Sequence, residues 1–473
     1  MPIRRKARKI KRRFSRRFLK LLRRTSRVFA VVLSIPAIAL LGAVLYFSVA
    51  LPDTYYVSDA QGFSLSQYRI ITPIQKEEEP AAVSVLVSMA DAEKEAKKLE
   101  NSLSGDGETT RFQLMLGGVI PVKTVVVVET DERYVVPSGS VFGLKMLTDG
   151  AVIAALSPIE TASGTSCPAE QAGLQAGDII LSANGEQVDS YDTLSSVISV
   201  AGQSGDKVRI TYSRDGKQSE TLLSPVQALT GEWLTGMWVR DSSAGIGTIT
   251  FVDPSSGCFA ALGHGVCDAD TGVLLPLGWG EICGATILGV TRGTAGSPGE
   301  LQGAFLNSSL SLSGRPGKDG VISSGTVLEN LFCGLIGQVN GDGLALSAEQ
   351  EMVAVCPRQE VHTGTAKILS TIGGTTPQLF DVVIEKVSYT DGADSSSRNI
   401  VLKITDPVLL AATGGIVQGM SGSPIIQDGR LIGAVTHVFV SDPSKGYGIF
   451  AETMLEAMDE TLEKQESRQE NIG

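Results

Sequence analysis

Residues 418–426 read QGMSGSPII and lie near the C-terminal end of a 473-residue chain, between a Gly-Gly pair and an apolar run typical of a β-strand. Glycine, serine and proline gather in ordinary turns for conformational reasons, so the stretch is compatible with a simple loop. It is equally compatible with a sharp turn that presents a nucleophilic hydroxyl, at Ser421 or at Ser423. The rest of the chain has to separate these two interpretations.

The composition indicates folded, glycine-rich domains behind a basic N-terminus. Hydrophobic residues make up 42% of the chain and charged residues only 19%, which excludes a disordered protein, and 53 glycines favour β-rich structure. Residues 1–27 contain 14 Arg or Lys and no acid, whereas the remainder has 26 basic against 51 acidic residues. The net charge of −11 therefore conceals a strong asymmetry between the two ends.

An apolar segment follows the basic block directly. Residues 28–51 hold 24 residues without a charge, and about 20 are enough to cross a bilayer as a helix. The basic flank predicts a cytoplasmic tail at 1–27, a transmembrane signal anchor at 28–51 and an exported C-terminal part. Nucleic-acid binding is the alternative for the basic block, and the adjoining apolar span favours membrane orientation instead. A cleaved signal peptide is a further alternative, because small residues occur at 48–50, but the apolar run is longer than a usual signal core.

The beginning of the exported part predicts a stalk, and its cysteines predict no metal site. Residues 52–112 are rich in charged and polar residues and are expected to be exposed and open to proteolysis. The six cysteines form no Cys-x-x-Cys pair and no zinc-like spacing with histidine, so buried free thiols are expected. We expect neither a metal nor another cofactor.

A distinctive glycine pattern predicts a peptide-binding domain. Residues 172–185 read AGLQAGDIILSANG, followed by a helical segment near 192–200 and a strand at 207–212. The pattern AGL-x-x-GD-x-I-x-x-x-NG resembles a PDZ domain of the kind associated with bacterial proteases, which we assign to residues 113–226. The resemblance implies a carboxylate-binding loop beside which a peptide adds as a strand. The residues that correspond to this loop are Val141, Phe142, Gly143 and Leu144.

Residues 227–473 read as an all-β domain closed by one helix. Short strand-like runs separated by Gly, Asp, Ser and Pro predict a barrel or a sandwich. The apolar spacing of residues 451–465 predicts a terminal helix. The expected strands lie at 245–252, 273–277, 285–290, 382–387, 400–404 and 431–436.

Three histidines limit the choice of a catalytic base. His264 lies between two glycines, a setting that leaves an imidazole accessible to a nucleophile. His437 lies in an alternating strand pattern and is interpreted as a structural histidine, and His362 has no partner motif. The sequence GMSGSP fits the Gly-x-Ser-Gly-x-Pro pattern of chymotrypsin-like serine proteases, which favours Ser421 as nucleophile. The backbone N–H groups of Gly419 and Ser421 are then expected to form the oxyanion hole.

The acid that orients the histidine is harder to choose. Eight aspartates lie between His264 and Ser421, and Asp406 follows the strand 400–404 at a position suited to accept the Nδ1 proton of His264. Asp268 is only four residues from His264 and is interpreted as the cap of a local turn.

At this point the chain resembles the stage IV sporulation protein B (SpoIVB) peptidases of endospore-forming bacteria, over nearly its full length. The stretches that carry the resemblance are IPVK at 120–123, GHG at 263–265, IVQGMSGSPI at 416–425 and GAVTHV at 433–438. It implies a chymotrypsin-like double β-barrel at 227–473, a triad of His264, Asp406 and Ser421, and self-cleavage in the N-terminal region. It also implies cleavage of a membrane-bound regulator of an intramembrane protease that processes a sigma-factor precursor, at the forespore membrane.

Two other functions are compatible with parts of the sequence. A membrane-tethered scaffold without catalysis would use only the PDZ domain, but the three triad residue types and the glycine pattern count against it. A quality-control protease of the HtrA type shares the PDZ domain and the triad chemistry. In that class the PDZ domain commonly follows the protease domain, whereas here it precedes it.

Overall fold

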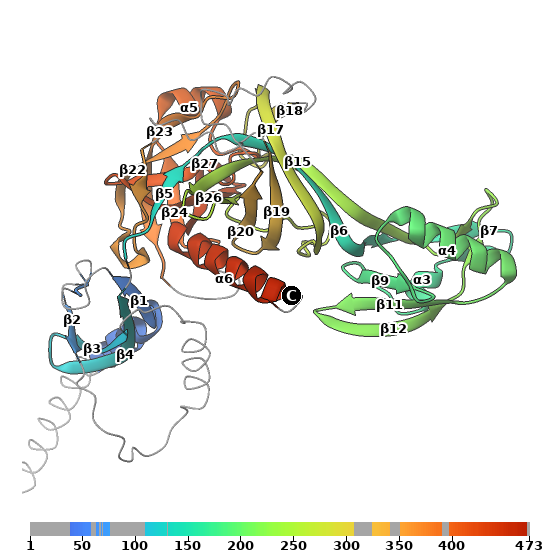
Figure 1. Cartoon of the computed structure of the whole chain (residues 1–473), viewed down its shortest axis with the longest axis horizontal. Helices are drawn as coiled ribbons and strands as arrows, with labels where there is room; N and C mark the ends of the chain where they lie inside the picture. Colours follow the sequence, from blue (N-terminus) through green and yellow to red (C-terminus); the bar gives the residue numbers. More distant parts are fainter. Residues whose placement is uncertain are drawn as a thin grey trace, which may run out of the picture. The chain divides into compact units, whose positions relative to one another are not determined.

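The computed structural model divides the chain into two units, residues 1–131 and residues 132–473 (Figure 1). The structure describes residues 38–57, 63–65, 68, 70–75, 109–129, 131–306, 324–340, 351–389 and 397–470.

The first unit contains a short helix and a small sheet. Residues 38–50 are helical, and four strands pair in the order β1-β4-β3-β2. Apolar side chains alternate along β3 and β4, and Phe112, Leu114, Val125 and Val127 are buried with Tyr55 in one core. The bounds are Thr54–Val57 for β1, Ile71–Gln75 for β2, Thr109–Leu116 for β3 and Ile120–Glu129 for β4.

This sheet corrects two predicted boundaries. The first is the stalk predicted at 52–112. That prediction is wrong where strands occur, because β1, β2 and the start of β3 belong to a folded sheet. A PDZ domain beginning at 113 is wrong for the same reason, since β3 runs across that position and β4 completes the sheet. Residues 28–37 of the predicted membrane anchor lie outside the described residues. Among the helices that are described, none is long and apolar enough to span a bilayer.

Six strands of the second unit close into a first ring. Their pairings run β6-β17-β19-β20-β16-β15, and β15 pairs back onto β6. The interior holds Phe142, Leu144, Ile249, Phe259 and Leu335. The bounds are Val141–Leu156 for β6, Met237–Asp253 for β15, Cys258–Ala261 for β16, Leu277–Thr291 for β17, Ser324–Leu331 for β19 and Gly334–Val339 for β20. Strand β18 (Glu300–Phe305) pairs with β17, and β5 (Tyr134–Pro137) joins β15 to β21 (Val353–Ala354).

A second ring is the closed barrel β22-β23-β24-β27-β26-β25. The C-terminal helix α6 (Ala451–Glu470) packs on both rings, because Met454 and Met458 share a core with Phe251 of β15 and Ile449 of β27 (Figure 1). The terminal helix is thus confirmed. The barrel strands are Gly364–Ser370 (β22), Gln378–Val387 (β23), Ile400–Ile404 (β24), Pro424–Gln427 (β25), Arg430–Phe439 (β26) and Asp442–Phe450 (β27), and α5 (Pro407–Thr413) follows β24.

The PDZ region is assembled from segments on both sides of its glycine pattern. Helix α4 (Tyr191–Ser204) buries Leu194, Ile198 and Ala201 against strands β9 (Ile179–Ala183), β11 (Val208–Arg214) and β12 (Lys217–Leu223). Met237 and Val239 of β15 pack on the same core, and β15 pairs there with the end of β6. The long ribbon β6–β15 therefore belongs to the PDZ region at one end and to the first ring at the other.

The predicted carboxylate-binding loop is wrong. Val141, Phe142, Gly143 and Leu144 lie inside β6, where β15 pairs along one edge and β17 along the other. No edge is left at these residues for an added peptide strand. Phe142 and Leu144 are buried instead in the interior of the first ring. The strand expected at 273–277 is also absent, except that Leu274 forms a single bridge with Cys267 and Leu277 begins β17.

Candidate active site

The turn at Ser421 connects α5 to β25 and is clamped against β15. The amide of Thr248 donates to the carbonyl of Ser421 (3.1 Å), and its hydroxyl donates to the carbonyl of Gly419 (2.8 Å). Gly422 has φ +97°, and a Cβ at this position would lie 2.0 Å from the Thr248 carbonyl oxygen. Only glycine fits there, so the second glycine of the motif is required by packing as well as by conformation.

The structure separates the two candidate serines. Ser423 is fully buried, and its hydroxyl donates to the hydroxyl of Ser370 at 2.9 Å. Ser421 is only half-buried, and its hydroxyl donates to the carbonyl of Thr436 at 2.7 Å. The serine chosen from the motif is therefore the one with an accessible hydroxyl.

The backbone N–H groups of the turn fall into two sets. The N–H of Met420 donates to the carbonyl of Val417, that of Gly422 to the carbonyl of Val435, and that of Ser423 to the carbonyl of Met420. Within the described part of the chain, those of Gly419 and Ser421 donate to no protein group. The two N–H groups expected in the oxyanion hole are thus the two that remain available to a ligand oxygen.

His264 follows strand β16 of the first ring and meets the second ring. Gly263 has φ +69°, and a Cβ there would lie 2.9 Å from Cγ2 of Thr436 on β26. Nδ1 of His264 lies 3.0 Å from the carbonyl oxygen of Gly265. A carbonyl can only accept, so Nδ1 carries the proton and Nε2 keeps its lone pair. Burial lowers the pKa of His264, although the bond to Gly265 opposes this, so the ring is neutral and basic at neutral pH.

His437 lies directly beside this base, which the sequence interpretation did not anticipate. The ring centroids of His264 and His437 are 4.9 Å apart and the planes are inclined by 38°. Burial, followed by the charges of His264 and Arg398, lowers the pKa of His437 to about 4. Its Nδ1 is buried without a hydrogen-bond partner in the described structure. The alternating pattern correctly placed His437 on a strand, but only strand register could bring it to His264.

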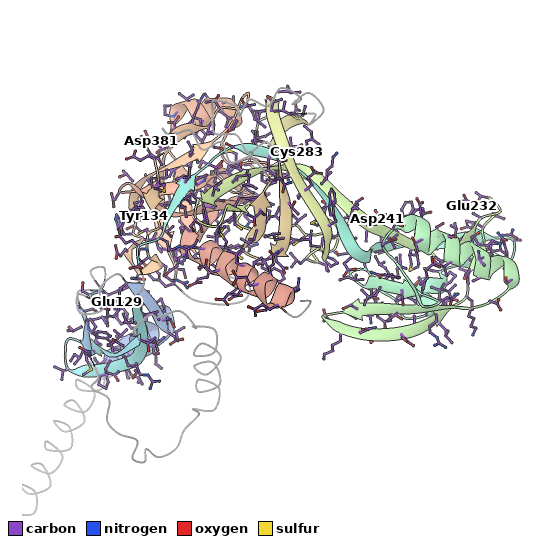
Figure 2. The ribbon with its side chains drawn as sticks, viewed as in Figure 1. Glu129, Tyr134, Glu232, Asp241, Cys283 and Asp381 are labelled. Atoms are coloured by element: carbon purple, nitrogen blue, oxygen red, sulfur yellow. The ribbon has the colours of Figure 1, made fainter. Side chains whose placement is uncertain are left out.

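Asp406 is placed differently from the prediction. It is the N-cap of α5, and its carboxylate accepts from the amides of Val408 (2.8 Å) and Leu409 (3.1 Å). The same carboxylate accepts from the amide of Asp381 on β23, labelled in Figure 2 (3.3 Å). No hydrogen bond or ion pair of the described residues joins Asp406 to His264. The predicted contact within the triad is therefore not made in this structure.

The loop after His264 is held by residues outside the predicted set. Buried Asn330 accepts from the amide of Val266 and donates to the carbonyls of Val266 and Leu275, at 2.8 to 2.9 Å. Asp268 caps its local turn, as interpreted from the sequence, by accepting from Thr271. It also forms an ion pair with Nε of Arg240 on β15, at 2.6 Å. An asparagine at the end of a strand carries no distinctive sequence signal, which explains why Asn330 was missed.

The remaining candidates lie elsewhere. His362 is exposed and pairs with Asp428 at 3.0 Å. All six cysteines are free thiols. Where side chains are described, no group of three His, Cys, Asp or Glu residues is arranged to hold a metal.

Comparison with known proteins identifies both domains. The family model of the SpoIVB peptidase S55 matches residues 231–455, and the model of the PDZ domain matches residues 142–224. Curated relatives include the zinc metalloprotease RasP of Shouchella clausii, 38% identical over 73 residues, which are 15% of this chain and 17% of that protein. They also include the "Probable periplasmic serine protease do/HhoA-like" of Haemophilus influenzae, 42% identical over 52 residues, which are 11% of each chain. The chain thus spans less than a fifth of the length of these relatives.

Two solved structures are similar to parts of the chain. The PDZ domain of the SdrC-like protein from Listeria monocytogenes is 22% identical, with a TM-score of 0.16, over 19% of this chain and 87% of that one. The active form of the Rv3671c protease from M. tuberculosis is 14% identical, with a TM-score of 0.24, over 45% of this chain and 72% of that one. The family models, the Ser421 turn and the neighbouring His264 lead to one conclusion. The chain combines a PDZ domain with a serine peptidase domain, and the serine peptidase domain matches the SpoIVB peptidase S55 family over residues 231–455.

Proposed function

We propose that the chain is a membrane-anchored, exported endopeptidase that cleaves itself and a membrane-bound regulator of an intramembrane protease, and so triggers activation of a sporulation sigma factor. The observation that carries the peptidase part is that Ser421 and the segment of His264 both contact β26, in a domain that matches the SpoIVB peptidase family. The basic tail and the apolar segment at 28–51 support the membrane location. The substrates are proposed from the resemblance to the family.

The two rings support a chymotrypsin-like arrangement. The base His264 follows a strand of the first ring, and the nucleophile Ser421 precedes a strand of the second. A site formed between two barrels draws its groups from both, so neither barrel is active by itself. We therefore infer a double barrel with the substrate binding where the two rings meet.

The proposed reaction is acyl transfer to Ser421. In the resting structure the Ser421 hydroxyl donates to Thr436, so it must rotate toward Nε2 of His264 before attack. Oγ then bonds to the peptide carbonyl carbon while its proton moves to Nε2, and the carbonyl oxygen becomes an oxyanion. When the C–N bond breaks, the same proton passes to the leaving amine. Water repeats the sequence and releases the acyl group from Ser421.

The free amides of the turn supply the oxyanion hole. The N–H groups of Gly419 and Ser421 are available, and Thr248 fixes the carbonyls of the same two residues through its amide and its hydroxyl. Preorganised donors of this kind are typically worth about 10²–10³ in rate each.

Strand β15 connects the PDZ region to both catalytic groups. Near its start, Asp241 accepts from the amide of Tyr191 at the N-terminus of α4 (2.9 Å), and Arg240 pairs with Asp268 in the loop after His264. Near its other end, Thr248 clamps the Ser421 turn. We propose that a peptide bound to the PDZ region acts on cleavage through this strand. We place the peptide between β15 and α4, because both edges of β6 at 141–144 are already paired with β15 and β17.

Two experiments test the proposed function. A fluorophosphonate probe should label wild-type protein and leave Ser421→Ala unlabelled, with Ser423→Ala as the matched control that still reacts. Mass spectrometry of the exported fragment should show N-terminal processing in wild type and a full-length Ser421→Ala chain. Processing of purified Ser421→Ala at the wild-type rate would show that self-cleavage does not use this site.

A further inference from the structure

The end of strand β19 packs against the segment that carries the base His264. Gly265 lies so close to this strand that a Cβ there would stand 2.8 Å from the carbonyl oxygen of Leu331. In the turn that follows β19, a Cβ on Gly334 would collide with the carbonyl oxygen of Ala261. The backbone on both sides of the base is therefore packed against one end of the first ring.

Buried Asn330 lies at this end of β19 and holds both backbone polar groups of Val266, the second residue after the base. Its Oδ1 accepts from the amide of Val266 at 2.8 Å, and its Nδ2 donates to the carbonyls of Val266 and Leu275 at 2.9 Å each. The amide of Val266 can only donate, so the side-chain amide of Asn330 has one possible orientation. In this orientation its oxygen and both of its N–H groups are used.

We propose that Asn330 is a positioning residue: it fixes the peptide unit that follows Gly265 and so holds the ring of His264 for proton transfer. The inference rests on the proposed function, since it assigns a role in the same reaction. Asn330 acts through the backbone beside the base, so it adds to the triad acid implied by the resemblance to the family, Asp406, and does not replace it.

A rigid peptide plane connects Asn330 to the imidazole. The carbonyl of Gly265 and the amide N–H of Val266 belong to one peptide unit, which is planar and points them in opposite directions. The N–H donates to Asn330, and the carbonyl oxygen lies 3.0 Å from Nδ1 of His264. A rotation of this plane that breaks the bond to Asn330 would also turn the carbonyl away from the imidazole. The bond to Asn330 also makes the carbonyl a better acceptor, since hydrogen bonds in a chain polarise one another.

A buried glutamine elsewhere in the domain provides a matched control. Gln427 at the end of β25 holds His362 as Asn330 holds Val266. Its Oε1 accepts from the amide of His362 at 3.2 Å, and its Nε2 donates to the carbonyls of His362 at 3.0 Å and Thr365 at 3.4 Å. Replacement of either side chain by leucine removes one acceptor and two donors from a backbone segment. The two changes remove similar hydrogen bonds, but the change at Asn330 acts beside the base.

Labelling of the full chain by a fluorophosphonate tests the role of Asn330. We expect Asn330→Leu to lower the maximal labelling rate by about 10–100-fold with little change in probe affinity, because a misplacement of about 1 Å can cost about 100-fold. Gln427→Leu should label near the wild-type rate. Asn330→Asp keeps an oxygen for the amide of Val266, so its rate should lie between those of the wild type and Asn330→Leu.

The pH profile of labelling separates positioning from a general loss of stability. Burial lowers the pKa of His264, and the bond to the Gly265 carbonyl raises it. A loosened carbonyl lets this pKa fall further, so the acid limb of the Asn330→Leu profile should move to lower pH, while that of Gln427→Leu stays in place. All variants share the titratable and charged groups near the base. These are His437, which packs on it from β26 and has a pKa of about 4, and Cys267, Asp268 and Arg240 along its loop.

The outcomes separate this proposal from the proposed function. Equal labelling rates and equal acid limbs for Asn330→Leu and Gln427→Leu would overturn the role of Asn330, because both side chains would then act only through stability. Urea unfolding of each variant gives the folded fraction to which the rates refer. If Asn330→Leu does not fold, Asn330→Asp is compared with Gln427→Glu by the same criteria. No labelling of the wild-type protein would instead overturn the proposed function.

Discussion

We expect His437 to make the fold less stable at acid pH, and the change in the free energy of unfolding can be calculated. A free histidine has a pKa of 6.5, whereas burial and the neighbouring charges lower that of His437 to about 4. Between these values the unfolded chain binds a proton that the folded chain does not. The free energy of unfolding therefore falls as pH falls through this window. The loss due to His437 is about 2 kcal/mol at pH 5 and about 3 kcal/mol once the pH is below 4.

The measurement uses urea unfolding in a Ser421→Ala background, which prevents self-cleavage. All three tryptophans, Trp233, Trp238 and Trp279, lie in the unit 132–473, so their fluorescence reports on that unit. We expect this background to lose about 2 kcal/mol more between pH 7 and pH 5 than the same background with His437→Phe. The comparison removes the contributions of the carboxylates, which both proteins share. An equal loss in the two proteins would refute the reasoning, because His437 would then titrate alike in the folded and unfolded chains.

Two further predictions concern residues that hold the Ser421 turn and the loop after His264 in place. Gly422→Ala should abolish labelling of Ser421 and lower the free energy of unfolding by about 2 kcal/mol or more. The reason is that the new Cβ would collide with the Thr248 carbonyl oxygen and that φ is positive at this position. Labelling and stability equal to those of the wild type would contradict the packing argument. Arg240→Met should lower stability by about 1–2 kcal/mol and slow labelling, because buried Asp268 loses its ion pair beside the His264 loop. Exposed Arg209→Met is the matched control, and equal effects of the two variants in labelling and thermal unfolding would exclude a role for the Arg240 pair.

Local patterns in the sequence determined several features correctly. The glycine string at 172–185 predicted the PDZ domain, and the spacing of apolar residues predicted helices α4 and α6. These features depend on the periodicity of apolar residues and on turn residues a few positions apart, and both can be recognised within a short stretch of sequence. The register of GMSGSP favoured Ser421 over Ser423, and its role as nucleophile stays a prediction; the structure shows that Ser421 is half-buried and Ser423 fully buried.

Other features were decided only by tertiary structure. Residues 141–144 became an interior strand because β15 and β17, which follow by about 100 residues or more, pair with both of their edges. Asp406 occupies a helix cap, although its position after a strand suited a triad acid equally well. His437 reaches His264 only because two rings close and β26 takes one particular register. A local pattern tells which face of a strand is buried, but which distant side chains meet there depends on ring closure and register, and these are set by the packing of the whole domain.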